Sequence, residues 1–191
     1  MQDKIKRIIE ESQSVKTSLL SEKTLALIEK AAKRIIEALN HGGKVIVFGN
    51  GGSASDSQHM VAELVGRFKK ERAAMPAIAL TTNTSTITAL SNDYGYDVSF
   101  KRQLEALGKK ADIAIGISTS GMAKNVIATL LKAKEMGLAT IGLTGTGGGA
   151  LKDIADLSIV VNSHDTARIQ EAHILIIHIL CELIEDALSS E

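Results

Sequence analysis

A histidine and a carboxylate stand four residues apart in the first half of the chain, at His59 and Glu63. The surrounding segment, up to about Phe68, is predicted to be helical, so both side chains share one helical face. An imidazole and a carboxylate held together can bind a divalent metal ion or move a proton. The same spacing is common in solvated surface pairs, so these two residues alone leave both interpretations open.

The last predicted helix, residues 167–188, offers three more candidate ligands: Gln170, His173 and His178. At about 100° per residue, Gln170 and His178 lie roughly 80° apart, whereas His173 and His178 lie roughly 140° apart. His178 therefore pairs better with Gln170, and His173 is expected to be structural or to support a ligand. Because Gln170 and His178 differ by roughly 12 Å in axial rise, binding one ion requires both side chains to lean together, or ligands from different subunits.

Two loops that follow apolar segments have the composition of ligand-binding loops. The first, GNGGS at residues 49–53, follows the run KVIVF. It is either a tight turn or a ligand loop; it lacks the Gly-Lys-Ser/Thr of a phosphate-binding P-loop, and Ala54 replaces the third glycine of a dinucleotide fingerprint. The second loop places Ser118, Thr119 and Ser120 before Gly121. One hydroxyl is enough to cap a helix, so three in a row favour a phosphate site at the helix start.

These loops must be positioned by the elements around them. Five short apolar segments rich in β-branched residues are predicted as strands, at residues 44–48, 77–80, 113–117, 140–143 and 158–161. Because they alternate with helical segments, they predict an α/β fold with a five-stranded parallel sheet sandwiched by helices, of the doubly wound, flavodoxin-like kind. Ligands of such folds bind at the carboxyl ends of the strands, where both loops fall.

The chain is predicted to be a single domain, residues 1–191. Two helices at about 3–20 and 22–40 form a helical segment, 1–41, that is expected to serve oligomerisation, and residues 42–191 form the core with its C-terminal helix. The last helix is apolar over much of its circumference, which also suggests contact with other subunits. The formal net charge is zero, so nucleic acid and anionic membranes are not expected partners. The one cysteine, Cys181, lies in an apolar run, which fits a reducing cytoplasm, and no apolar segment is long enough to span a bilayer.

Taken together, these motifs resemble the sugar isomerase (SIS) domain family, and within it the phosphoheptose isomerases. The resemblance covers nearly the whole chain and rests on VIVFGNGGSASDSQHMVAEL, on SNDYG at residues 91–95, on GISTSG and on RIQEAHILIIHIL. It implies an aldose–ketose isomerase that converts sedoheptulose 7-phosphate into D-glycero-D-manno-heptose 7-phosphate through an enediol. Such a reaction begins the synthesis of nucleotide-activated heptose for lipopolysaccharide, capsule or S-layer glycans.

The resemblance also implies roles for individual residues. One zinc ion per subunit is expected, and Glu63 and His178 are the expected catalytic residues. A homotetramer with active sites at subunit interfaces is implied as well. The expected zinc ligands are His59, Glu63, Gln170 and His178. The expected substrate contacts are Asn50, Gly51, Gly52, Ser53, Glu63, Asn92, Asp93, Ser118, Thr119, Ser120 and Gln170, with the three hydroxyl residues on the phosphate. Where the family commonly has a further serine in this loop, the chain has Ala123.

Three other interpretations compete with the enzyme. A related SIS protein is a non-catalytic scaffold that binds the replication initiator DnaA, but it lacks the acidic residue and the histidine that this chain has at Glu63 and His178. A sugar-phosphate sensor would need the phosphate loop without the metal and proton-transfer residues. A nucleotide-binding protein is disfavoured because neither nucleotide fingerprint is complete.

Overall fold

The structure, a computed structural model, describes residues 1–189. Within that range the chain forms five strands, which are β1 (Val45–Gly49), β2 (Ala77–Ala79), β3 (Ile113–Ser118), β4 (Ala139–Thr144) and β5 (Leu157–Val160). All neighbours are parallel, in the order β2-β1-β3-β4-β5. The helices are α1 (Gln2–Ser18), α2 (Glu22–Asn40), α3 (Gly52–Val65), α4 (Thr84–Tyr94), η1 (Tyr96–Val98), α5 (Ser99–Leu107), α6 (Lys124–Glu135), α7 (Gly149–Ile154) and α8 (Thr166–Leu188). The predicted α/β class and five-stranded parallel sheet are confirmed.

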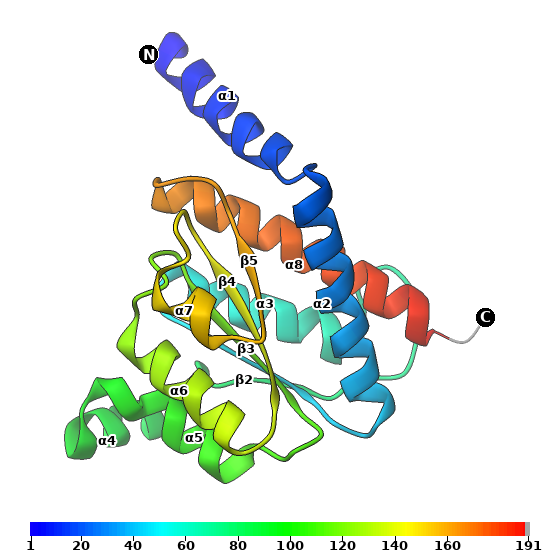
Figure 1. Ribbon diagram of the computed structural model, residues 1–191, viewed down its shortest axis with the longest axis vertical. Coiled ribbons are helices and arrows are strands. Elements are labelled where there is room, and N and C mark those ends of the chain that lie inside the picture. Colours follow the sequence, from blue (N-terminus) through cyan, green and yellow to red (C-terminus); the bar gives the residue numbers. More distant parts are fainter. Residues whose placement is uncertain (190–191) are drawn as a thin grey trace.

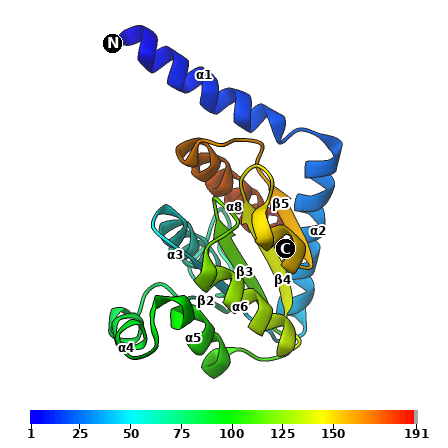
Figure 2. The same ribbon diagram turned by 60° about the vertical axis from the view of Figure 1, so that its left-hand side comes forward.

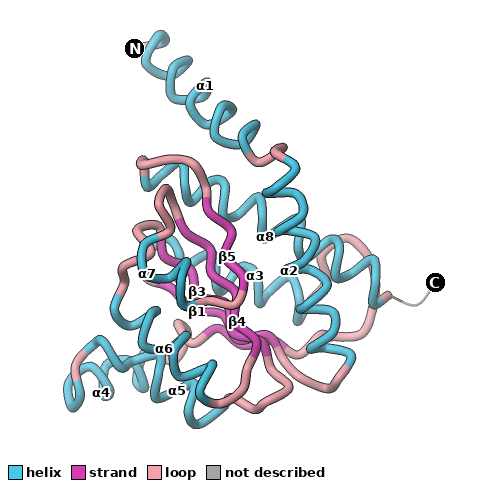
Figure 3. The backbone as a smooth tube through the Cα atoms, in the orientation of Figure 1, coloured by secondary structure: helices cyan, strands magenta, loops and turns pink. Residues whose placement is uncertain are grey.

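The sheet has a separate apolar layer on each face, because successive strand residues point to opposite sides. On β1, Val45 and Val47 pack into the core beneath α2, α3 and α8, whereas Ile46 and Phe48 pack into the core beneath α5, α6 and α7. Figure 1 shows α8, α2 and α3 on one side of the strands and α6, α5 and α4 on the other. Figure 3 shows the strands, in magenta, enclosed by these two helical layers.

Strand register brings the two candidate loops together at one edge of the sheet. Gly49, the last residue of β1, is aligned with Ile117 of β3, and Ser118 is aligned with Thr144 of β4. Consequently the GNGGS loop and the Ser118–Gly121 loop leave adjacent strands at the same level. This is the carboxyl edge that parallel α/β proteins use for ligands.

The N-terminal helix α1 leaves the body of the molecule, as Figures 1 and 2 show from two directions. Ser21 begins α2 by accepting a hydrogen bond from the backbone N–H of Thr24, which separates the two helices. On α1, Ile5 and Ile9 are 51% and 52% exposed. An oligomerisation role for residues 1–41 stays a prediction.

The apolar circumference of α8 finds much of its contact within the chain. Its buried residues, among them Ile176, Ile177 and Leu180, belong to the core formed with α2, α3 and the strands. The expectation that α8 needs another subunit therefore does not follow from its composition. Among residues 1–189, no helix combines the length and apolarity needed to cross a membrane.

Candidate active site

The site lies along the seam where α3 and α8 run side by side. Three contacts follow each other in the same chain order on both helices, so the helices are parallel. Gln170 lies against Gly52 at the start of α3, and His178 lies against His59 in its middle. Beyond the end of α3, the backbone N–H of Phe68 donates to Glu185. The buried faces of both helices, including Met60 and Leu64 of α3, hold this register by packing into one core.

Three of the four predicted metal ligands meet in the middle of the seam. The Nε2 atom of His59 lies 3.0 Å from Nε2 of His178 and 3.1 Å from Oε1 of Glu63. The three ligand atoms all lie within 4.8 Å of one another. Two imidazole nitrogens and one carboxylate oxygen match the donor set of catalytic zinc sites, which keep a further position open for water or substrate. His59 is exposed and the other two are partly buried, so a ligand can reach them.

Gln170, the fourth predicted ligand, lies elsewhere on the seam. A methyl group added at Gly52 would come within 2.4 Å of its Nε2 atom. Gly52 precedes His59 by seven residues, which is roughly 10 Å along the helix. The structure therefore brings Gln170 to the GNGGS loop and leaves it about two turns from the His59–Glu63–His178 cluster. Its place fits a substrate contact, and its binding to metal remains a prediction.

The side chain of Asn50, in the GNGGS loop, is fixed by residues that the sequence did not single out. Its amide exchanges two hydrogen bonds of 2.9 Å with Asn125 of α6, and Tyr96 donates its hydroxyl to Oδ1 of Asn50 over 2.8 Å. Asn125 is only 3% exposed, so the pair is a buried tie between the loop and the opposite layer. Asn125 and Tyr96 therefore set how the loop can meet a ligand.

The rest of the GNGGS loop shows why its glycines are needed. Gly51 adopts a φ of +56°, a conformation that side chains rarely accept. Ser53 is buried inside the first turn of α3, which places it behind the loop surface and not on it. Of the predicted substrate contacts here, Gly51 and Gly52 are exposed and Ser53 is covered.

The hydroxyls of the second loop do not cap the helix that follows them. Helix α6 begins after Ala123, whose methyl group has no capping atom. Ser118 and Ser120 lie 3.5 Å apart through their Oγ atoms, and Ser120 accepts a hydrogen bond from the N–H of Met122. The capping interpretation is therefore wrong for this loop. Ser120 is exposed and Thr119 is partly exposed, so their hydroxyls are open to an anion at the start of α6, whereas Ser118 is buried at 6% exposure.

A polar pocket of about 170 Å³ opens beside these hydroxyls. It is lined by Thr119, Ser120, Thr146, Ser163, His164, Thr166 and Ile169. Three loops from adjacent strand ends and the first turn of α8 supply this lining. The pocket has the hydroxyl-rich walls expected of a neutral phosphate site.

Asn92 and Asp93, also predicted to touch substrate, lie apart from the cluster. Both are exposed at the end of α4, where Asn92 donates to Oδ1 of Asp93 over 2.9 Å. Within the described chain, the hydrogen bond that links this region to the GNGGS loop comes from Tyr96. The two residues are therefore connected to the site through Tyr96 and not through a contact of their own.

Two titratable groups on α8 and α3, one buried and one partly buried, have shifted pKa values. Burial lowers the pKa of His173 to about 4, although its bond to the carbonyl of Thr144 opposes this, so the ring is neutral near pH 7. This confirms His173 as a buried group bonded to the sheet and not a member of the cluster. Burial raises the pKa of Asp56 to about 6 despite the nearby charge of His59. Its Oδ2 atom is buried and meets no hydrogen-bond donor among residues 1–189.

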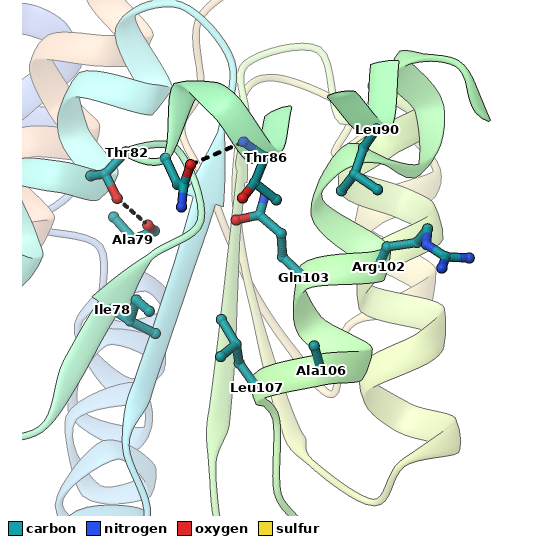
Figure 4. Close-up of a pocket in the computed structure, with 10 residues that line it drawn as sticks. Ile78, Ala79, Thr82, Thr86, Leu90, Arg102, Gln103, Ala106 and Leu107 are labelled. Carbon is teal, nitrogen blue, oxygen red and sulfur yellow. Dashed lines mark hydrogen bonds between the residues drawn. The ribbon is translucent and has the colours of Figure 1, made fainter. Parts of the chain in front are cut away.

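A larger pocket, of about 510 Å³, lies on the other face of the sheet. Figure 4 shows it between β2, α4 and α5, with Ile78, Leu90, Ala106 and Leu107 around it and Arg102 at its rim. Five of its ten lining residues are aliphatic, four are uncharged polar residues, and one, Arg102, is a cation. The groups able to move protons or hold a metal converge at the α3–α8 seam, so the seam, not this pocket, is the candidate active site.

The fold and the seam define an α/β protein with candidate ligand loops at the carboxyl edge of its sheet and, between α3 and α8, a His–Glu–His group that could hold a metal ion. A family model described as the SIS domain matches residues 9–145. The phosphoheptose isomerase of Geotalea daltonii is 53% identical over 194 residues, covering 100% of this chain and 99% of that one. The solved phosphoheptose isomerase of Neisseria gonorrhoeae superposes with a TM-score of 0.90 at 40% identity, covering 97% and 98% of the two chains. The solved phosphoheptose isomerase of Francisella tularensis superposes with a TM-score of 0.93 at 39% sequence identity, covering the same shares of the two chains.

The chain belongs to the SIS domain family and, within it, to the phosphoheptose isomerases.

Proposed function

We propose that this protein interconverts sedoheptulose 7-phosphate and D-glycero-D-manno-heptose 7-phosphate with the help of one zinc ion per subunit. The observation that carries this proposal is the convergence of His59, Glu63 and His178 at the α3–α8 seam. A regulatory scaffold has no need of three converging ligands, whereas a metal-assisted isomerase uses them. The full-length likeness to named phosphoheptose isomerases supports the same substrate.

The residues can divide the work of isomerisation in a chemically balanced way. Glu63 removes a proton from C1 of the ketose and returns it to C2 of the enediol, which moves the carbonyl from C2 to C1. His178 carries the accompanying proton from the hydroxyl at C1 to the oxygen at C2. Zinc held by His59, Glu63 and His178, with Gln170 as the further predicted ligand, would supply a Lewis acid that stabilises negative charge on these oxygens.

Glu63 can take part in binding and in proton transfer because a carboxylate has two oxygens. Its Oε1 atom faces His59 in the cluster, which leaves Oε2 as the candidate base. We place the phosphate group at Ser118, Thr119 and Ser120, next to the polar pocket, where backbone N–H groups at the start of α6 compensate for the missing hydroxyl at Ala123. Asn50, Gly51 and Gln170 would contact the sugar between these two ends.

The exposed isoleucines of α1 support the proposal that the protein is a homotetramer. Ile5, Ile8 and Ile9 are between 39% and 52% exposed along one side of a helix that leaves the body. A second copy would bury them. Light scattering on the wild type and on a variant with Ile5→Glu and Ile9→Glu would test this, and an unchanged mass would count against α1 as the contact. We also propose that the enzyme acts in the cytoplasm, because its expected substrate is a sugar phosphate and its one cysteine, Cys181, is a buried free thiol.

The direct test uses sedoheptulose 7-phosphate and NMR detection of aldose anomeric protons. Metal-stripped, zinc-restored and Glu63→Gln samples are compared with the untreated protein. Aldoheptose signals that disappear on stripping, return with zinc and are absent in Glu63→Gln are expected. Turnover that survives stripping would remove zinc from the mechanism, and the absence of turnover with zinc restored would reject the isomerase.

A further inference from the structure

We propose that Phe68, Arg72 and Glu185 form a positioning unit that holds His178 and Glu63 in working geometry. The unit lies at the far end of the α3–α8 seam and touches neither the sugar loop nor the phosphate loop. Its role rests on the proposed function, because it acts through two residues of that reaction. Glu185 is 1% exposed and, with His173, is one of two polar residues buried on α8.

The carboxylate of Glu185 is saturated with hydrogen bonds from one short segment, residues 68–72. The backbone N–H groups of Phe68, Lys69 and Lys70 donate to it at 2.9, 2.7 and 3.0 Å, and Nε of Arg72 donates at 3.2 Å. Burial would raise the pKa of Glu185, but these donors outweigh it and hold the pKa below its ordinary value. The side chain is therefore an ionised anchor that fixes the segment after α3 onto α8.

Arg72 uses the rest of its guanidinium to close the end of α3. Its Nη2 atom donates to the carbonyl of Glu63 at 2.7 Å, and its Nη1 atom donates to the carbonyl of Leu64 at 2.9 Å. The last carbonyls of a helix have no partner within the helix. A cation there satisfies them and complements the negative end of the helix dipole. The same residue thus joins the backbone of the proposed base, Glu63, to the Glu185 anchor on the opposite helix.

Phe68 links the Glu185 anchor to His178, because its ring stacks on the His178 ring. Its ring lies 5.5 Å from the His178 ring, centroid to centroid, at an interplanar angle of 25°. His178 also meets the ring of His59, 5.0 Å away at 56°. Because it contacts two rings, the His178 imidazole has less freedom to rotate, and its Nε2 atom faces His59 in the cluster. Because the N–H of Phe68 is itself bonded to Glu185, the stack depends on the buried ion pair.

Stability alone is a weak reason for such a pair, since a buried ion pair is often no more stabilising than apolar residues in its place. What this pair does beyond stability is to couple the ends of two helices, each of which contributes a residue to the reaction. A matched comparison is present in the same chain. Asp112, 3% exposed, accepts bonds from Lys44 and from the N–H of Lys109 at the opposite edge of the sheet.

The test measures kcat, KM for sedoheptulose 7-phosphate and zinc affinity by calorimetry in four variants. Phe68→Leu and Glu185→Gln are expected to weaken zinc binding and lower kcat by roughly 10- to 100-fold, as loss of a ligand's supporting partner does, with KM within about twofold. Phe68→Tyr, which keeps the ring, is expected to restore both values. Asp112→Asn is expected to lower the melting temperature while leaving zinc affinity and kcat unchanged.

Each outcome bears on the proposal. If Phe68→Leu keeps wild-type kcat and zinc affinity, or if Asp112→Asn reduces them as much as Glu185→Gln does, the positioning role is rejected. Phe68 is only half-buried, so its variants test the proposal even if Glu185→Gln does not fold. A wild type that binds zinc but does not turn over would reject the proposed function instead, and the zinc affinities of the Phe68 variants would still decide the positioning role.

Discussion

Two carboxyl groups of the α3–α8 seam differ in their hydrogen bonding and in the direction of their pKa shifts. Glu185, at the end of the seam, receives four hydrogen bonds, and the pKa of its carboxyl is held below the ordinary value. Asp56, one helical turn before His59, has a buried oxygen with no donor in the described chain and a pKa raised to about 6. The carboxylate at the end of the seam has hydrogen-bond donors on both oxygens, whereas the carboxyl group beside the cluster has an oxygen without a donor among residues 1–189. The contrast separates the region that holds the shape from the region that reacts.

The largest effect should come from the reactive middle of the seam. Glu63→Gln keeps the size of the side chain but removes the base, so kcat should fall roughly 10²- to 10⁴-fold. Because the Glu63 side chain is partly exposed, the melting temperature of the Glu63→Gln protein should be close to that of the wild type. The NMR assay of aldose anomeric protons measures kcat, and a thermal melt measures the melting temperature. Glu135→Gln, an exposed change on α6, is the control, and equal losses in both variants would contradict the assignment.

Breaking the rigid end should instead destabilise the fold. Arg72→Ala leaves the Glu185 charge buried without its cation and frees the last carbonyls of α3, which should lower the free energy of unfolding by about 3–5 kcal/mol. Urea titration followed by circular dichroism measures it. Arg67→Ala, which removes an exposed cation from the same region, should change stability by less than about 1 kcal/mol. Similar losses in both variants would mean that the ion pair has no special role.

The start of the seam can be tested with one methyl group. Gly52→Ala would place a Cβ 2.4 Å from the Gln170 amide, so Gln170 must move or strain must be absorbed. Overpacking of this kind typically amounts to about 1–3 kcal/mol. We expect this strain at Gln170 to raise KM for the sugar phosphate several-fold. If the effect passes through Gln170, adding Gln170→Ala should raise KM no further; additive effects would contradict that link.

The smallest effect concerns Asp56 and its pH dependence. A raised pKa means that the folded chain binds this proton more tightly, so Asp56 adds stability below its ordinary value of 3.8 and loses it as pH rises through about 6. His173 has the opposite effect. Its pKa is lowered from 6.5 to about 4, so the stability that the neutral ring contributes is lost as the pH falls from 6.5 through about 4. Asp56→Asn should therefore steepen acid destabilisation.

At pH 7, Asp56→Asn should change the free energy of unfolding by about 1 kcal/mol, because Asp56 is only partly buried and solvent screens its charge. Unfolding of metal-free protein at pH 4 and pH 7 measures it. Wild type and Asp56→Asn should differ in stability by less at pH 4 than at pH 7, with the variant the more stable at pH 7. Parallel pH curves would show that the Asp56 proton plays no part.

The sequence predicted the layers well because the apolar strands and α8 carry local patterns. Helix α4 was not predicted, since its eleven residues are all exposed or partly exposed and give no amphipathic pattern. The seam could not be predicted either. The position of Gln170 beside Gly52, or of Asn125 beside Asn50, depends on pairing between segments far apart in the chain. Glu185 reads as an ordinary surface residue in sequence because nothing local reveals the segment that covers it.

The α3–α8 seam also has a consequence for biosynthesis. His59 and His178 are separated by 119 positions, and Phe68 and Glu185 by 117. One of the three residues of the reactive cluster, His178, is therefore translated near the end of the chain, after the strands that will support it. Contacts of such long sequence separation form late in folding. A nascent or C-terminally truncated chain lacks both His178 and the core residues that α8 packs onto the sheet, so the molecule is inert toward its substrate until the final helix has docked.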